Sequence, residues 1–405
     1  MRQTTIGTDF KVLNQCVACG HSSLELVIDL GDQTLANEYR VDKNEFEEFP
    51  LQLLRCMKCT HSQISIAVNP DRLFRDYSYV SSTSTTLSRY FEDFRDLIIQ
   101  DHGTTGNILD IGSNDGSFLQ KFNDLGWNCI GVDPAINLIP VAHAKGVLTL
   151  PTFFDRNTSS LLSENFDVIV AMNVFAHTAN PLEILHGIEN CLSENGVAYI
   201  QTSQANMFTH CQFDTIYHEH ISFFNVRSFK ALLERTSLKL LDVRIVPIHG
   251  DSYLWVISKN QSHDVYIGRE FDELKSGLYG SDLYVNFALE AHKKVQEVQK
   301  IIAEYRSKQF KIVSYGAAAK GNTFLNFAKL RMDFIVDDTK NKIGKLAPAG
   351  GCKVEDPKTI SDIKEPCLIL IPAWNFAREI SEKVQKLRNN PNDKILVYFP
   401  AIEFL

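Results

Sequence analysis

The chain has 405 residues, of which 44% are hydrophobic and 22% are charged, and its formal net charge is −8. A length above the roughly 250–300 residues that one hydrophobic core fills predicts two or three domains, and the negative charge argues against a broad nucleic-acid-binding face. No stretch approaches the roughly 20 apolar residues of a membrane helix, and no apolar signal core follows Met1, so we expect a cytoplasmic protein that does not enter a membrane.

Two CxxC pairs mark the N-terminal region. Cys16 and Cys19 form the first pair, and Cys56 and Cys59 form the second. Four thiolates complete a closed tetrahedral shell around zinc, so we expect a structural zinc ion in a small domain that covers residues 1–65. The alternative is two unrelated thiol pairs or a redox pair.

A polar, aromatic segment follows, at residues 73–86, with too many hydroxyl groups for a core element. We interpret it as a lid or substrate loop, which carries Tyr77 and Tyr79. Apolar residues at helical spacing then predict a helix over 87–101, and residues 107–111 read as a buried strand.

From there strands and helices alternate, which predicts a parallel sheet with helices on both faces. The predicted strands are 107–111, 129–132, 168–171 and 197–200, and the predicted helices lie near 117–125, 136–145 and 181–193. Two later strands, 240–245 and 253–257, are expected to pair antiparallel at the sheet edge. The predicted domain covers residues 66–265.

The loop after the first of these strands has the form of a site for S-adenosylmethionine. It contains Asp110, Gly112, Ser113, Asn114 and Asp115. Glycine lets the backbone approach the ligand, and the next helix begins there. We expect Asp110 to face the amino group of the methionine part. A nicotinamide dinucleotide site is the alternative, but it calls for a G-x-G-x-x-G pattern that this loop lacks.

Two further strand ends carry candidate donor-site residues. Asp133 ends the second strand and can accept hydrogen bonds from both ribose hydroxyl groups, with Pro134 shaping the turn. Asn173 and His177 follow the third strand, at the level of the sulfonium group. His177 is expected at the site because of this place, although a loop histidine bonded only to backbone is the alternative.

A phenol, a carboxylate and an imidazole lie together in the run from Tyr217 to His220. Methyl transfer to carbon needs a base that removes a weakly acidic proton, and a neutral imidazole is available near pH 7. We therefore expect His220 to be the general base, helped by Glu219 or Tyr217. A metal-binding H-x-H pair is the alternative.

The remaining segment, residues 266–405, predicts a second nucleotide-binding α/β domain. Residues 270–309 look largely helical, and a strand then leads into a loop of small residues and another helix. Backbone N–H groups and Lys320 are expected to cradle a pyrophosphate there. The candidate residues of this loop are Tyr315, Gly316, Lys320, Gly321 and Asn322.

The next strand of this domain ends at Asp337, and Lys342 follows in a basic loop. We include both among the candidate substrate-binding residues. A solvated basic loop is the alternative for the lysine.

With these motifs in this order, the chain resembles the sugar 3-C-methyltransferase family over nearly all of its length. The resemblance implies an α/β fold class with a Cys₄ zinc-binding N-terminal domain, a central class I (Rossmann-like) S-adenosylmethionine domain and a C-terminal Rossmann-like domain. Members of that family methylate C3 of a nucleotide-linked 4-keto-deoxysugar. The expected cofactors are S-adenosylmethionine and structural zinc, and the expected partner is a nucleotide-linked 4-keto-sugar.

The resemblance also implies roles for individual residues. The 4-keto group would acidify the C3 proton, His220 would remove it, and the enolate would attack the methyl group with inversion at C3. Glu219 and Tyr217 would assist, His177 would contact the sugar, and Tyr77 or Tyr79 would close the site. The chain departs from the family pattern at residues 249–252, His-Gly-Asp-Ser, and has no aromatic residue at the end of the run 81–86.

Two other functions fit parts of this pattern. One is a methyltransferase for oxygen or nitrogen of another small molecule, which needs only a base or proximity. The other is a zinc-headed interaction protein whose methyltransferase fold only binds. We expect no nucleic-acid partner and no membrane partner, and a monomer is compatible with the sequence.

Overall fold

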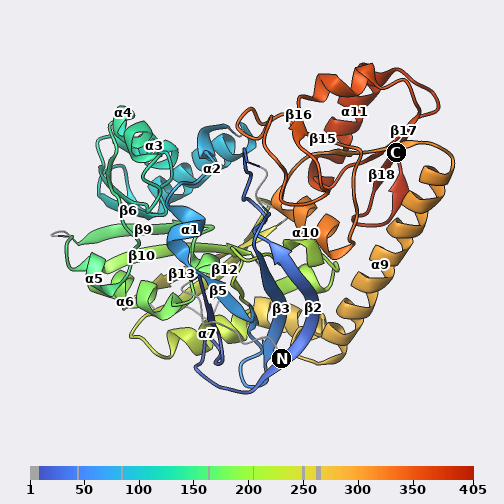
Figure 1. Ribbon diagram of the computed structural model, residues 1–405. Helices are drawn as coiled ribbons and strands as arrows, with labels where there is room; N and C mark the ends of the chain where they lie inside the picture. The colour runs from blue at the N-terminus through green and yellow to red at the C-terminus, as the bar shows by residue number, and fades with distance from the viewer. Residues whose placement is uncertain are drawn as a thin grey trace. The chain divides into compact units, whose positions relative to one another are not determined.

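The computed structural model describes residues 9–42, 45–83, 85–162, 165–203, 205–248, 251–260 and 266–405. The chain divides into two compact units (Figure 1). The first unit comprises Met1–Glu25, Leu54–Asn206 and Glu219–Tyr279, and the second comprises Leu26–Leu53, Met207–His218 and Gly280–Leu405. The boundaries expected from the sequence, 1–65, 66–265 and 266–405, stay a prediction. His249 and Gly250, noted above as a departure, lie outside the described residues.

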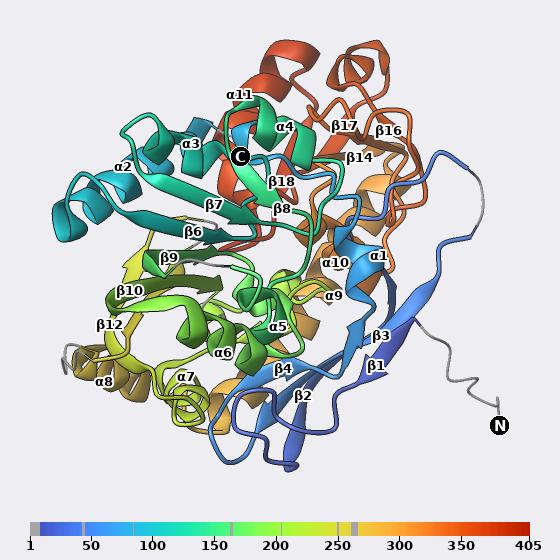
Figure 2. The same cartoon turned by 90° about the vertical axis from the view of Figure 1, so that its left-hand side faces the viewer.

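The first unit is built on a seven-stranded sheet in the order β12-β13-β10-β9-β6-β7-β8. Figure 2 shows β6, β7, β9 and β10 side by side in this sheet. The strands are β6 (Asn107–Ile111), β7 (Asn128–Val132), β8 (Leu148–Leu150), β9 (Phe166–Met172), β10 (Leu192–Ser203), β12 (Lys239–Val246) and β13 (Ser252–Ser258). β6 to β10 run parallel, and β12 and β13 form the predicted antiparallel pair at the edge.

Helices cover both faces of this sheet because successive strand residues point to opposite sides. In β9, Val168 and Val170 pack into one core cluster, while Ile169 and Ala171 pack into the other. The first cluster contains side chains of α2 (Thr85–His102), α3 (Ser117–Asn123) and α4 (Ile139–Ala144), and the second contains side chains of α6 (Pro181–Cys191) and α7 (Val226–Leu233). The unit also contains α1 (Pro70–Phe74), α5 (Arg156–Ser159) and α8 (Ile267–Lys275). The predicted alternation of strands and helices is confirmed.

The predicted lid segment is irregular between two helices. Helix α1 begins at Asn69, whose side chain accepts a hydrogen bond from the N–H of Asp71, and Pro70 occupies its first turn. After α1 the backbone has no regular element until the 3₁₀ helix Ser81–Thr83, and α2 follows. The predicted helix 87–101 lies within α2.

In its described residues, the N-terminal region is built of five strands, β1 to β5, which pair in two small sheets. β1 (Phe10–Val12) pairs antiparallel with β5 (Ile66–Val68). β11 (Ser222–Phe223), β4 (Ser62–Ile64), β3 (Glu48–Cys56) and β2 (Leu24–Thr34) follow one another in a second sheet, and the division between the units falls within β2 and β3. In the first unit β11 pairs with β4, so the strand that begins two residues after His220 joins the sheet that leads to Cys56.

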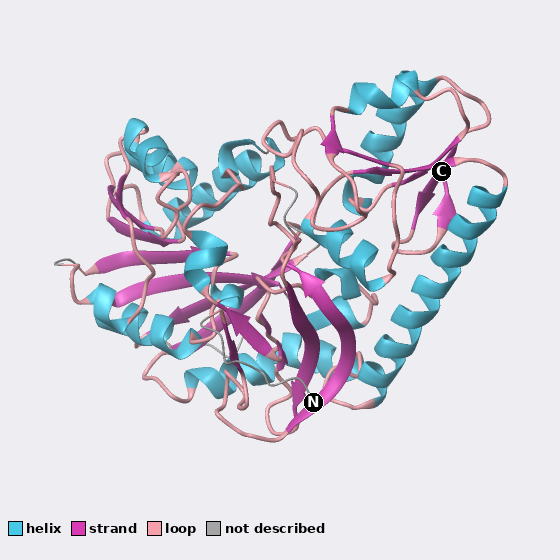
Figure 3. Cartoon of the chain, in the orientation of Figure 1, coloured by secondary structure: helices cyan, strands magenta, loops and turns pink. Residues whose placement is uncertain are grey.

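The second unit has a six-stranded sheet in the order β16-β15-β14-β17-β18-β19, parallel except for β19. Its strands are β14 (Lys311–Tyr315), β15 (Phe334–Val336), β16 (Val354–Glu355), β17 (Cys367–Leu370), β18 (Lys394–Val397) and β19 (Glu403–Phe404). Its helices are α9 (Asp282–Ser307), α10 (Ala319–Phe327) and α11 (Ala377–Arg388), of which α9 is the long cyan helix in Figure 3. The predicted strand, small-residue loop and helix after residue 310 are confirmed.

The expectation that residues 270–309 are largely helical is confirmed, but the sequence did not predict that two helices share this segment. The chain forms α8 and α9 with a break between them, where Gly277 has a φ of 82°. Glycine adopts this left-handed conformation without steric cost, and a second glycine, Gly280, follows. Among the described residues, no helix has the length and apolar content needed to cross a lipid bilayer.

Candidate active site

The candidate donor site begins where β6 ends. β6 has β7 on one side and β9 on the other, so the chain leaves the sheet in opposite directions on its two sides, which is where open α/β sheets bind ligands. Gly112 has a φ of 76°, and a Cβ atom added to it would lie 2.4 Å from Cγ2 of Val174. The loop therefore needs glycine at this position.

Asp110 supplies the test of whether a cationic ligand fits this loop. Its side chain is 2% exposed, and its Oδ1 atom has no hydrogen-bond partner among the described residues. Burial, and then the charge of Asp133, raises the pKa of Asp110 well above its usual range. An unpaired buried carboxylate is costly. The ammonium group of S-adenosylmethionine would remove that cost, so Asp110 fits this cofactor.

Asp133 links the two loops of the donor site. Its Oδ2 accepts the N–H of Asn114 at 2.7 Å, and its Oδ1 accepts the N–H of Ala135 at 2.8 Å, across the turn that contains Pro134. Each oxygen keeps a further lone pair for a ribose hydroxyl group. Burial raises the pKa of Asp133. The hydroxyl group of Ser113 is buried without a hydrogen-bond partner in the described part of the chain.

Two other predicted donor-site residues have protein partners. Asp115 forms an ion pair with Lys145 at 2.7 Å. Burial alone would raise the pKa of Asp115, but its hydrogen bonds, above all that from Lys145, leave it lowered. Asn173, with a φ of 55°, accepts a hydrogen bond from the side chain of Gln201 at 3.0 Å. Tyr90 donates to the same Gln201 at 2.6 Å, so buried polar groups set the position of Asn173.

Four predicted catalytic side chains lie together in the first unit. The rings of His177 and His220 are 5.1 Å apart, centroid to centroid. The hydroxyl group of Tyr77 donates to Oε2 of Glu219 at 3.4 Å. Phe74 connects the two pairs, since its ring is 5.8 Å from that of Tyr77 and stacks at 5.8 Å on His177.

The run from residue 217 to 220 is a loop, and its residues differ in their surroundings. Glu219 is 4% exposed, and His220 is partly exposed. Tyr217 and His218 belong to the second unit. There His218 packs edge-on against Phe49 at 5.9 Å, and burial lowers its pKa to about 4, so its imidazole is neutral at neutral pH.

Tyr79 lies on the donor side of the lid rather than beside Glu219. Its backbone carbonyl accepts a hydrogen bond from the side chain of Asn114 at 3.1 Å. Burial, and then the carboxylate of Asp115, raises the pKa of Tyr79, although 41% of this residue is exposed. Of the two tyrosines, Tyr77 is therefore the one that contacts the candidate acceptor side chains.

The predicted metal site is a compact cluster of four sulfur atoms, from Cys16, Cys19, Cys56 and Cys59, all within 4.8 Å of one another. Cys16 and Cys59 are 3.5 Å apart, and Cys19 and Cys56 are 3.6 Å apart. A tetrahedral zinc site with Zn–S bonds of about 2.3 Å has sulfur atoms roughly 3.8 Å apart, so the cluster fits zinc. Three of the four side chains are buried, which excludes solvent from such an ion.

Hydrogen bonds join the metal cluster to the rest of the first unit. Arg235 donates to the carbonyl oxygen of Ala18 at 2.9 Å, and Asn225 donates to the carbonyl oxygen of Thr60 at 2.9 Å. His61 is fully buried and lies 3.3 Å from the hydroxyl group of Ser222, which keeps its ring outside the sulfur cluster. The cluster is therefore joined to the segment that follows His220.

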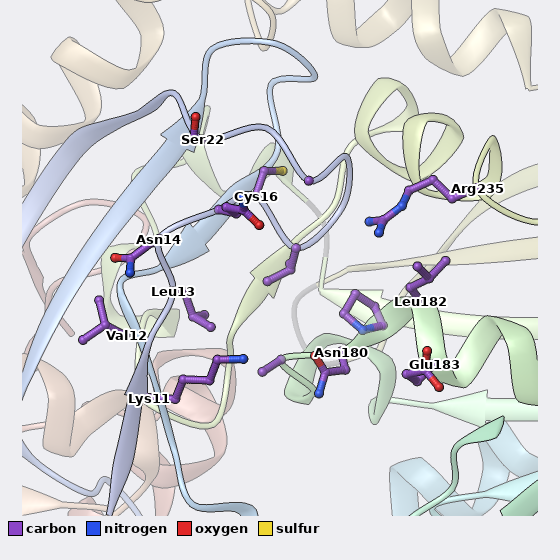
Figure 4. Close-up of a pocket in the computed structure, with 15 residues that line it drawn as sticks. Lys11, Val12, Leu13, Asn14, Cys16, Ser22, Asn180, Leu182, Glu183 and Arg235 are labelled. Atoms are coloured by element: carbon purple, nitrogen blue, oxygen red, sulfur yellow. The ribbon is translucent and has the colours of Figure 1, made fainter. Parts of the chain in front are cut away.

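A pocket of about 630 Å³ lies beside this cluster (Figure 4). Figure 4 shows the segment from Lys11 to Ser22 facing Asn180, Leu182 and Arg235 across it. Apart from Cys16, none of its lining residues is a predicted site residue.

In the second unit the predicted phosphate loop follows β14. Tyr315 is buried and its pKa is raised to about 12, chiefly by burial, and Gly316 has a φ of 111°. A Cβ atom on Gly321 would lie 2.6 Å from Cβ of Pro372, so this glycine lets helix α10 approach the loop after β17. The ammonium group of Lys320 lies 4.8 Å from the ring centroid of Trp374.

Asp214, which is not among the predicted site residues, lies near Lys320 in the second unit. It is fully buried, and its Oδ2 accepts hydrogen bonds from the indole N–H of Trp374 and the hydroxyl group of Tyr398, both at 3.0 Å. Burial lowers the pKa of Lys320, and the charge of Asp214 raises it again in part. A lone acidic residue between Phe213 and Ile216 was the available sequence signal.

Two other candidates in this unit are bonded to protein. Asn322 donates to the carbonyl oxygen of Ala36 at 2.8 Å and to the hydroxyl group of Tyr39 at 2.9 Å. Lys342 donates to the carbonyl oxygen of Ala317 at 2.8 Å. The hydrogen bonds of Asn322 and Lys342 thus hold the loop after β14 in place through other parts of the same unit.

The two units share one local construction. In the first unit, the N–H of Gly112 donates to the carbonyl oxygen of Val132, and the side chain of Asp133 accepts an N–H from the glycine loop, both at 2.7 Å. In the second unit, the N–H of Gly316 donates to the carbonyl oxygen of Val336, and the side chain of Asp337 accepts the N–H of Ala317, again at 2.7 Å. In both units the acid follows the glycine by 21 residues. Burial would raise the pKa of Asp337, but Lys342 and backbone N–H groups leave it lowered.

Comparisons with known proteins match each part of the chain to a family. Residues 16–74 match a zinc binding domain, residues 84–243 a methyltransferase domain, and residues 247–400 a C-methyltransferase C-terminal domain. The chain is 27% identical over 394 residues to C-methyltransferase NovU of Streptomyces niveus. This match covers 93% of this chain and 94% of that protein.

Two solved structures that resemble this chain each cover 42% of it. Magnesium protoporphyrin IX methyltransferase of Synechocystis PCC 6803 with bound S-adenosylmethionine has a TM-score of 0.33 and 9% identity, covering 42% of this chain and 78% of that one. An S-adenosylmethionine-dependent methyltransferase of Clostridium acetobutylicum has a TM-score of 0.35 and 13% identity, covering 42% and 91%.

Proposed function

We propose that the chain is a C-methyltransferase that uses S-adenosylmethionine and methylates C3 of a nucleotide-linked 4-keto-deoxysugar. Its successive matches to a zinc binding domain, a methyltransferase domain and a C-methyltransferase C-terminal domain support the proposal. The observation that carries the proposal is the cluster of His177, Glu219 and His220 with Tyr77, in the unit that has the donor loop. A carbon acceptor needs a base for its proton, and this cluster offers an imidazole beside a carboxylate and a phenol.

The reaction replaces a C–H bond by a C–CH₃ bond. Bound S-adenosylmethionine supplies an electrophilic methyl group. His220 takes the C3 proton, which the adjacent 4-keto group acidifies, and the electron pair left on C3 forms the bond to the methyl carbon. As this bond forms, the bond between the methyl carbon and the sulfonium sulfur would break, and its electron pair would stay on S-adenosylhomocysteine. The proton is then released to solvent, so the acceptor gains one methyl group and loses one proton.

The other residues of the cluster orient the groups that react. The carboxylate of Glu219 accepts from the hydroxyl group of Tyr77, which holds the phenol at the edge of the cluster. His177 lies 5.1 Å from His220, within reach of the same small ligand. Tyr217 remains a proposed helper from the adjoining part of the loop.

Lys320 supports the choice of a nucleotide-linked acceptor. Lys320 lies in the first turn of α10, where backbone N–H groups have no acceptor within the helix, and an ammonium group at such a position suits a diphosphate. Asp337 has the same position relative to the glycine loop of this unit as Asp133 has in the first unit, and its carboxylate could likewise accept hydrogen bonds from a ribose. These features suit the second unit to the binding of a nucleotide.

The test is incubation with nucleotide-linked 4-keto-sugars in deuterated water, with and without S-adenosylmethionine. We expect deuterium at C3 when S-adenosylhomocysteine replaces the methyl donor, and a C3 methyl group when the donor is present. Methyl transfer to oxygen or nitrogen, or binding of both ligands with neither exchange nor transfer, would contradict the proposal. A series of nucleotides that differ only in the base would show which acceptor is used.

A second expectation concerns phosphate binding. Asp214→Asn should weaken the binding of nucleoside diphosphates by roughly tenfold at high pH, because burial lowers the pKa of Lys320 and the charge of Asp214, which opposes this effect, is removed. Losing that charge lowers the pKa of Lys320 further, so the loss should grow as pH rises through the lowered pKa and be smaller at low pH. Calorimetric titration of thymidine, uridine and guanosine diphosphates between pH 7 and 9.5 would measure it.

The exposed Asp362 provides the control, since Asp362→Asn removes the same charge from a surface position in the same unit. An equal loss of affinity at every pH would show that Asp214 does not act through the protonation of Lys320.

A further inference from the structure

The lid segment is bonded to both loops of the candidate donor site, all within the first unit. After α1, the carbonyl oxygen of Arg75 accepts the N–H of Ile136 at 3.1 Å. Further along, the N–H of Ser82 donates to Asp115 at 3.3 Å. Two asparagine side chains, those of Asn137 and Asn114, make the remaining connections, and each of them bonds to the lid backbone twice.

Asn137 holds the backbone of one lid residue from both sides. Its Oδ1 accepts the N–H of Tyr77 at 3.0 Å, and its Nδ2 donates to the carbonyl oxygen of Tyr77 at 2.9 Å. A neighbouring strand would bond to a residue in the same two-fold way. Asn137 is exposed, so it has no need of these bonds to satisfy a buried amide. The two hydrogen bonds therefore fix the position of Tyr77 and do not stabilise a buried group of the core.

Asn114 makes the matching connection from the first donor loop. Its Oδ1 accepts the N–H of Ser81 at 2.9 Å, and its Nδ2 donates to the carbonyl oxygen of Tyr79 at 3.1 Å. The backbone N–H of the same residue donates to Asp133, the proposed ribose ligand, and its φ is 51°. One residue thus connects the donor loop, the ribose acid and the lid.

Tyr77 carries the connection into the candidate acceptor cluster. Its backbone is bonded to Asn137, while its hydroxyl group donates to Glu219 at 3.4 Å. The ring of Tyr77 also contacts Phe74, which itself stacks on His177. Any shift of the loop after β7 would move the Tyr77 backbone and, with it, the phenol.

We propose that Asn137 and Asn114 are positioning residues that bond the lid to the two donor loops, so that binding of the methyl donor orders Tyr77 for the acceptor reaction. The proposal rests on the proposed donor site and extends the proposed function. It predicts an order of events in which a ligand with an adenosine group tightens the two loops, the loops hold residues 75–82, and the acceptor then meets a completed cluster.

Hydrogen–deuterium exchange tests the proposal without any acceptor. In the unaltered protein, saturating S-adenosylhomocysteine should slow amide exchange across residues 75–82. In Asn137→Ala the ligand should still bind within about twofold, because both ends of the Asn137 amide are bonded to Tyr77, yet this protection should fall by roughly tenfold. Equal protection in both proteins would overturn the proposal.

The kinetic arm separates positioning from a general structural role. A small misplacement of a reacting group can cost up to about 100-fold in rate, so Asn137→Ala should lower kcat by roughly tenfold or more with little change in the KM for S-adenosylmethionine. Asn137→Asp keeps the acceptor for the Tyr77 N–H and should recover part of kcat. An unchanged kcat, or a fall in Tm that accounts for the whole loss, would overturn the proposal.

Asn123→Ala is the matched control. Asn123 is another exposed asparagine that donates to a backbone carbonyl oxygen, that of Gly146 at 3.3 Å, at the far end of α3 from the donor loop. Its replacement should leave both the protection and kcat unchanged. If the sugar substrates prove wrong but the exchange result holds, the proposed function fails while the lid connection stands.

Discussion

The His220→Asn enzyme should bind S-adenosylmethionine with unchanged affinity and turn over about 10²–10⁴ times more slowly than the unaltered enzyme. Asparagine keeps a polar side chain of similar reach but has no group that takes up a proton near pH 7. The partly exposed imidazole lies 5.1 Å from His177, outside the donor loop that holds Asp110 and Asp133.

Two measurements assign the loss to proton removal. Exchange of the C3 proton, followed by NMR in deuterated water, should fall as much as methyl transfer does. Calorimetric titration with S-adenosylhomocysteine should give a dissociation constant within about twofold of the unaltered value. If proton exchange persists at its original rate, another residue is the base, and if donor affinity falls steeply, His220 belongs to the donor site.

His186→Asn provides the control for this experiment. His186 also lies beside a carboxylate, that of Glu189 at 3.1 Å, but it lies on α6. Its replacement removes an imidazole–carboxylate pair of the same kind without touching the candidate cluster. We expect kcat and the exchange rate to stay at their original values.

The second large effect concerns zinc. Cys59→Ser should cost the protein its metal ion and lower Tm by roughly 10 °C or more, because a structural zinc site contributes many kcal/mol and each kcal/mol is worth about 2–4 °C in a domain of 150–250 residues. Cys59 is 7% exposed and belongs to a core cluster with side chains of α6 and α7. Metal analysis and thermal unfolding would measure the two changes.

Loss of zinc should also reduce turnover in the fraction that remains folded. Strand β4 lies between the two cysteines of the second pair and the loop of His220, because the N–H of Ile64 donates to the carbonyl oxygen of Ile221 at 3.0 Å and β4 pairs with β11. Cys352→Ser, which alters a partly buried thiol outside the cluster, should retain zinc, Tm and kcat. A zinc-free protein with an unchanged Tm would exclude a structural role for the metal.

Local patterns in the sequence predicted the elements whose causes are local. The two CxxC pairs identified the sulfur cluster, because each turn brings its own two thiols together. The strand, the glycine and the acid 21 residues later predicted the donor loop, because glycine and an acceptor at a strand end have few other uses there. The break between α8 and α9 also has a local cause, the positive φ of Gly277. The sequence did not predict it, because the residues on both sides have helical periodicity.

The side-chain contacts that the sequence did not predict join residues that lie far apart along the chain. Asn322 bonds to the carbonyl oxygen of Ala36, 286 residues away, and no local pattern announces such a partner. Asn137 is an exposed asparagine in a turn, which is ordinary in any loop, and only its two bonds to Tyr77 distinguish it. The roles of His220, Glu219 and Lys320 stay predictions, since their chemistry depends on a bound acceptor.

The strand, glycine and acid construction that occurs in both units has a practical consequence for engineering. Gly112 and Asp133 belong to one copy, and Gly316 and Asp337 belong to the other. Under the proposed function, a library that varies the first copy would be screened with donor analogues that carry larger alkyl groups. A library in the second copy would be screened with unnatural nucleotides, and because the two sets of substitutions share no residue, their gains could be combined in one biocatalyst.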